Sequence, residues 1–130
     1  MPKEQEPTIK IEVLERRLKE LRRDFQQTIV GGAGEENDGW VGKALFCYWQ
    51  LSACRSLAKG TIDGRSEDVA RLLSPKLDSK RSDRRSNAKE VRKGLKEDEN
   101  FLLKGLEKEE EDKAKEALKT LGKYLEKIVK

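Results

Sequence analysis

The residues best suited to chemistry form a basic run between Ser79 and Lys96, SKRSDRRSNAKEVRKGLK. Guanidinium forks match phosphate oxygens in geometry as well as charge, and lysine ammonium groups add mobile point charges. If a helix covers residues 88–96, the cations of that segment lie along one of its faces. We therefore expect a nucleic-acid-binding surface made of Lys80, Arg81, Arg84, Arg85, Lys89, Arg92, Lys93 and Lys96.

RNA is the favoured ligand of this surface. Short arginine-rich segments of similar composition bind structured RNA, often gaining order on contact. In double-stranded RNA the deep major groove hides the base edges, so phosphate contacts dominate and shape is read more than sequence. Two other interpretations stay open for the same residues. In the first, the charges form a solvated face or pair with the acidic residues that follow them, in the same or another subunit. In the second, KRSDRR (80–85) is a nuclear import signal.

The balance of charge inverts directly after the basic run. Residues 76–96 hold nine cations against three acids, whereas residues 97–112 hold eight acids against two cations. The two blocks could form ion pairs with each other, or the acidic block 97–112 could bind a protein partner. The alternative function is therefore a helical assembly or adaptor protein that acts by homo-oligomerisation and protein contacts, without affinity for RNA.

A second group of cations lies near the N-terminus. Arg16, Lys19 and Arg23 share a face of the helix expected there, because they follow i, i+3 and i+7 spacing. Acids at Glu12, Glu15 and Glu20 are placed for ion pairs with their neighbours. This pattern favours the salt-bridged exterior of a coiled coil over a second binding surface.

Enzymatic, metal and cofactor chemistry find little support. The chain has no histidine, which excludes Ser-His-Asp, Cys-His and HExxH sites, and no other general base stands out. Cys47 and Cys54 cannot complete a zinc tetrahedron, and on a helix they lie about 10.5 Å apart, too far for a disulfide. We expect no enzyme, no metal, no cofactor and two reduced packing thiols.

The elements that position these residues are predicted to be helices. The 130 residues are 42% charged and 35% hydrophobic, with a mean hydropathy of −0.89, and no segment alternates with the period of a strand. Such a chain buries narrow apolar stripes. We expect an all-α fold, a compact bundle of four to five helices around a central apolar helix at 40–59. Its four aromatic residues (Trp40, Phe46, Tyr48 and Trp49) are expected in the core.

The first helix carries a heptad stripe that predicts a homodimer. Its apolar residues recur in alternating steps of three and four, and the rest of its surface is charged. Only this narrow apolar stripe can be buried, so the helix requires a partner helix to cover it. An antiparallel intramolecular bundle is the alternative. The predicted dimer interface consists of Ile11, Leu14, Leu18, Leu21 and Phe25.

The remaining segments complete the expected organisation. Residues 1–8 form a disordered N-terminal tail, and residues 9–130 form a single helical domain that contains a mobile basic linker at 76–87. After a short helix at 69–73, a fourth helix begins near Ala88, with Asn87 in its capping box, and a final helix covers 113–129. The last two form one rod or a hairpin.

No targeting signal is apparent. The first residues, MPKEQEPTIK, lack the apolar region of a secretory leader, and no eighteen apolar residues run together. We expect an intracellular protein, cytoplasmic or nuclear, without a membrane partner.

The N-terminal heptads and the following segment ENDGWVGKAL (36–45) also resemble the coiled-coil assembly region of delta-type viral antigens. This resemblance covers about a fifth of the chain, and we assign no family on it.

Overall fold

The computed structural model describes residues 11–35, 37, 39–60, 69–70, 72 and 81–129, with the backbone alone at 11, 81–84 and 129. These residues form the helices α1 (Ile11–Gly32), α2 (Gly39–Lys59), α4 (Arg81–Glu97), α5 (Glu99–Leu102) and α6 (Lys108–Val129). Within the described part of the chain there is no strand. The prediction of an all-α bundle is therefore confirmed.

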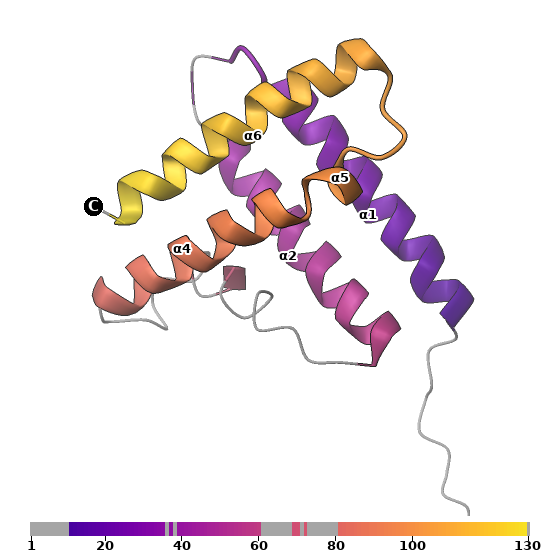
Figure 1. Ribbon diagram of the computed structural model, residues 1–130. Coiled ribbons are helices and arrows are strands. Elements are labelled where there is room, and N and C mark those ends of the chain that lie inside the picture. Colours follow the sequence, from indigo (N-terminus) through magenta and orange to yellow (C-terminus); the bar gives the residue numbers. More distant parts are fainter. Residues whose placement is uncertain are drawn as a thin grey trace, which may run out of the picture.

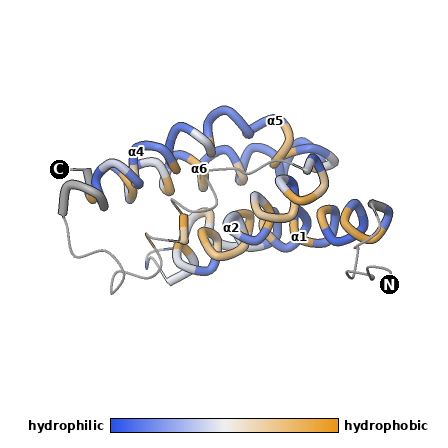
Figure 2. The backbone as a smooth tube through the Cα atoms, turned by 90° about the horizontal axis from the view of Figure 1, so that it is seen from below, coloured by the Kyte–Doolittle hydropathy of each residue, from blue (hydrophilic) through white to orange (hydrophobic). Residues whose placement is uncertain are grey.

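The helices pack in two layers. α1 and α2 form an antiparallel hairpin, and α4 and α6 pack against each other with α5 between them in the chain (Figure 1). Figure 2 shows the α1–α2 pair as one layer and α4, α5 and α6 as the second. The layers meet mainly where α1 contacts α6 and α5. Each layer therefore covers the inner side of the other and leaves its outer side to solvent.

The apolar stripe of α1 is covered by a helix of the same chain. Leu14, Leu21 and Phe25, three of the five residues predicted at a dimer interface, are buried in the core of the single chain, and Leu18 is half-buried. The side chain of Ile11 lies outside the described residues. Because α2 packs along α1, this seam is covered without a second copy, and homodimerisation stays a prediction.

The central apolar helix is present but is not enclosed on every side. α2 buries Val41, Tyr48 and Leu51, whereas the side chains of Phe46 and Leu57 are 46% and 62% exposed. The prediction of an enclosed helix, with all its aromatic residues in the core, is therefore wrong on this face. The physical reason is that a two-layer bundle leaves each helix one side without a neighbour.

The connection between α1 and α2 is short. α1 continues through Gly32 and α2 begins at Gly39. The indole of Trp40 lies so close to Gly32 that a Cβ there would overlap the ring. Glycine at this position therefore allows the hairpin to close, because the ring takes the space of a side chain.

Two helix boundaries differ from the expected ones. α4 begins at Arg81 instead of near Ala88, so residues 81–87 of the expected linker 76–87 are helical, and Asn87 is buried inside the helix instead of capping it. Residues 76–80 and the tail 1–8 lie outside the described residues. α6 begins at Lys108, five residues early, because the acids of its first turn complement the helix dipole.

Polar contacts join the two layers near α5. The carboxylate of Asp98 accepts a hydrogen bond of 2.9 Å from the Tyr48 hydroxyl and lies 3.2 Å from the guanidinium of Arg55. The ring of Phe101 lies 4.2 Å from the Arg55 guanidinium and 4.8 Å from that of Arg22, which are cation–π distances. These contacts, which we call the Asp98 anchor, tie α1 and α2 to α5.

Loss of the Asp98 carboxylate should destabilise the fold. We expect Asp98→Ala to lower the free energy of unfolding by about 1–3 kcal/mol, because the Tyr48 hydroxyl and the Arg55 guanidinium lose an acceptor in a largely buried place. Tyr48→Phe should cost about 1 kcal/mol. Urea unfolding followed by circular dichroism measures both. Glu90→Ala, on the exposed side of α4, is the control. An equal loss of unfolding free energy in this variant would show that the Asp98 anchor does not contribute to stability.

Candidate nucleic-acid interface

The basic residues of α4 gather on its outer side. Arg85, Lys89, Arg92, Lys93 and Lys96 are all exposed, whereas the opposite side of the helix buries Ala88, Val91 and Leu95. At 100° per residue these five cations occupy an arc of about 100°. We call them the α4 stripe.

Five of the eight predicted contact residues are therefore placed together. For Arg81 and Arg84 the structure describes the backbone only, in the first turn of α4, and Lys80 lies outside the described residues. Asn87, a neutral polar residue within the same basic run, is 5% exposed and lies on the inner side of the helix. It cannot reach a ligand on the stripe.

A groove beside the stripe extends the basic surface onto α6. It has a volume of about 630 Å³, and its floor is formed by Leu95, Leu118 and Gly122. Its walls carry five cations and two acids, namely Arg92, Lys96, Lys115, Lys119 and Lys123 with Glu99 and Glu126. We call this the α4–α6 groove. Since cations outnumber acids along it, the groove favours an anionic ligand.

The lysines of α6 are the part of the site that sequence reasoning missed. Lys115, Lys119 and Lys123 recur every four residues and so lie on one face of the helix. That spacing is a readable signal, but it does not show which helix lies opposite. Only the antiparallel packing of α4 on α6 brings these lysines to Arg92 and Lys96.

The ion pairs along the groove leave its cations accessible. Arg92 lies 3.8 Å from the Glu126 carboxylate, and Lys115 lies 3.4 Å from that of Glu111. The side chains of all four residues are 40–51% exposed. Water screens pairs of this kind, which contribute little to stability and exchange readily for a stronger anion.

The acidic block has described partners on α2 and α6. Asp98 pairs with Arg55 on α2, and Glu111 pairs with Lys115 within α6. Among the described residues, no group of three or more metal-ligating side chains lies together. In that same part of the chain, no helix has the length and apolar character needed to cross a bilayer.

The two cysteines, Cys47 and Cys54, are buried free thiols on α2. Cys54 donates a hydrogen bond of 3.4 Å from its thiol to the Leu14 carbonyl. Burial raises the pKa of both thiols above the ordinary 9.0, and the nearby Asp24 carboxylate adds to the rise at Cys47. The expectation of unpaired packing thiols is confirmed for these two residues.

Neither thiol should react readily in the folded protein. Because the pKa of each thiol is raised, less thiolate forms at pH 8, and burial also hinders access of a reagent. We therefore expect 5,5′-dithiobis(2-nitrobenzoate) to modify the thiols far more slowly in buffer than in guanidinium. The raised pKa also means that these thiols support folding below pH 9.0 and that this support is lost as the pH rises through their folded pKa. Equal rates in both solvents would contradict this account.

Comparisons of the chain with protein-family models, with curated proteins and with solved structures find no match. The fold and the site define a helical bundle whose α4 and α6 carry an exposed basic stripe and a basic groove.

Proposed function

We propose that this protein is a non-enzymatic RNA-binding protein that contacts the phosphate backbone through the α4 stripe. The observation that carries the proposal is the placement of Arg85, Lys89, Arg92, Lys93 and Lys96 on one exposed side of a single helix. From Arg85 to Lys96 this side is about 16 Å long. A rigid row of cations of this length suits several successive phosphates.

The surroundings of the stripe favour double-stranded or folded RNA over a single strand. Neither α4 nor the lining of the α4–α6 groove contains an aromatic residue. Proteins that hold single strands stack bases on aromatic side chains, so this surface lacks their main device. Proteins that bind duplex RNA use phosphate and 2′-hydroxyl contacts instead, which exposed lysine and arginine side chains supply.

The proposal is tested by removing two cations of the stripe. Fluorescence anisotropy would measure the binding of a short RNA duplex, the matching single strand and duplex DNA between about 50 and 200 mM salt. For Lys89→Ala with Lys93→Ala, we expect weaker binding of every sequence. The slope of log K against log salt should become shallower by about 2, because two phosphate contacts are lost.

A matched pair on α6 supplies the control. Lys113→Ala with Lys127→Ala removes the same charge from exposed positions that line neither the α4 stripe nor the α4–α6 groove. This pair should keep nearly the full slope. An equal loss of affinity in both double variants would mean that RNA binding depends only on net charge. Absence of RNA binding by the parent protein at the lowest salt would refute the proposal.

A second candidate function, assembly with further copies of this chain, has one observation in its favour. Phe46 and Leu57 expose apolar surface on the outer side of α2, with Trp49 in contact with Phe46 at 5.4 Å between ring centroids. The steps from Phe46 through Trp49 and Ala53 to Leu57 are three, four and four residues, which is the spacing of a helix-pairing seam. Two copies of this seam could cover each other across a two-fold axis.

Sedimentation equilibrium would test the assembly. If α2 pairs with its copy, Phe46→Glu with Leu57→Glu should convert a dimer to a monomer, because each change places a charge in the apolar contact. Val13→Glu is the control, since Val13 is 49% exposed but lies on α1. A monomeric parent protein, or a dimer that survives the double change, would exclude this seam.

A further inference from the structure

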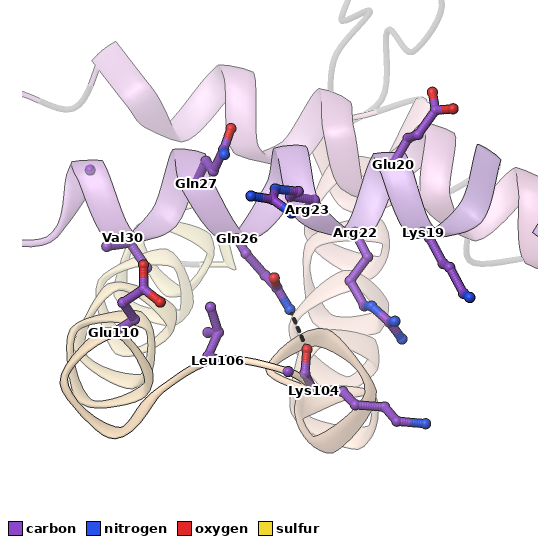
Figure 3. Close-up of a pocket in the computed structure, with 12 residues that line it drawn as sticks. Lys19, Glu20, Arg22, Arg23, Gln26, Gln27, Val30, Lys104, Leu106 and Glu110 are labelled. Atoms are coloured by element: carbon purple, nitrogen blue, oxygen red, sulfur yellow. Dashed lines mark hydrogen bonds between the residues drawn. The ribbon is translucent and has the colours of Figure 1, made fainter. Parts of the chain in front are cut away.

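A second basic hollow lies between α1 and the connection from α5 to α6 (Figure 3). Its volume is about 670 Å³, and it shares no lining residue with the α4–α6 groove. Lys19, Arg22 and Arg23 line it from α1, and Lys104 lines it from the connection. We call it the α1 hollow. The sequence pattern assigned the cations of α1 to a salt-bridged exterior, and it placed Lys104 only among the two cations of the acidic block 97–112.

The acids of the α1 hollow offset its cations only in part. Two carboxylates belong to the lining, Glu20 and Glu110. Glu20 is paired with Arg17, outside the hollow, at 3.2 Å, and Figure 3 shows its carboxylate on the side of α1 opposite to Lys19 and Arg22. The lining therefore carries four cations against two carboxylates, an excess of two positive charges. This excess favours a ligand with more than one negative charge.

The wall opposite α1 is held in place by a buried amide. Gln26 is 8% exposed, and its side-chain nitrogen donates hydrogen bonds of 2.8 Å and 2.9 Å to the carbonyls of Leu102 and Lys104. Gly105 follows with a φ of +89°, a conformation that glycine adopts without strain. The Arg22 guanidinium lies over the ring of Phe101 at 4.8 Å. The backbone at Lys104 and the guanidinium of Arg22 are therefore held in place before any ligand arrives, which lowers the entropic cost of binding.

We infer that the α1 hollow binds a ligand with adjacent phosphates, a diphosphate or triphosphate group. Arginine guanidinium groups pair with phosphate oxygens through two parallel hydrogen bonds, and the hollow combines two arginines with two lysines. Its volume lies within the range of small-molecule sites. Val30 and Leu106 add apolar surface beside the charges, where a nucleoside could lie.

Inorganic triphosphate is the probe for the first experiment. Isothermal titration calorimetry at low salt should show one site, and Arg23→Ala with Lys104→Ala should weaken it by at least about tenfold, since each removes a charge-assisted hydrogen bond. Two substitutions serve as controls. Arg16→Ala removes an exposed cation of the same helix outside the hollow, and Lys113→Ala removes one from α6. Both should change the affinity by less than about twofold.

A spectroscopic readout separates this site from general charge attraction. In ¹H–¹⁵N correlation spectra, triphosphate should shift the side-chain amide of Gln26 and the backbone amide of Gly105, whereas the amides of residues 85–96 should stay in place. Shifts centred on α4, or equal weakening by Arg16→Ala, would overturn the inference. Lys89→Ala with Lys93→Ala should leave triphosphate binding intact, so failure of the RNA proposal and failure of this one are distinguishable.

Two further ligands identify the source of the phosphates. Adenosine triphosphate binding more tightly than inorganic triphosphate would identify a free nucleotide. An RNA with a 5′-triphosphate binding more tightly than the same RNA with a 5′-hydroxyl, and losing that advantage in Lys104→Ala, would identify an RNA end. Equal affinity for triphosphate and for monophosphate would overturn the requirement for adjacent phosphates.

Discussion

The arrangement of the two layers depends on the short stretch of chain around α5. The Asp98 anchor joins this stretch to α2 through the Tyr48 hydroxyl and the Arg55 guanidinium, and Gln26 joins it to α1 through two backbone carbonyls. These polar groups are directional, unlike the apolar contacts of the surrounding core, and a buried partner left without its acceptor is costly. They therefore specify how α4 and α6 lie over α1 and α2, a choice that hydrophobic burial alone leaves loose.

The scarcity of apolar residues explains why the basic surfaces lie where they do. α4 and α6 each bury only a narrow stripe, and the rest of their circumference must face water. When two such helices pack side by side, their flanking residues meet along the groove that divides them. Five of the ten residues that line this groove are lysine or arginine, so the packing that builds the core also builds a basic groove.

The α4 stripe and the α1 hollow differ in physical character. The stripe is an open row of side chains on one helix, suited to a long, repetitive anion whose phosphates recur along its length. The hollow is concave and lined from two segments far apart in the sequence, with one wall held by Gln26, and it suits a compact anion. Lysine and arginine side chains thus form two surfaces of different shape, because the backbone that carries the charges sets the shape of each surface.

The sequence by itself determined the helical class, the apolar face of α1, the unpaired state of the cysteines and the exposed row of cations on α4, because each depends on residue type and local periodicity. It did not determine which segments lie next to each other. In the structure the apolar seam of α1 packs against α2 of the same chain, while Phe46 and Leu57 of α2 face outward. The lysines of α6 lie opposite Arg92 and Lys96, and Lys104 lies across from Arg22. Periodicity shows which side of a helix is apolar or charged, but only tertiary packing decides which segment lies opposite that side.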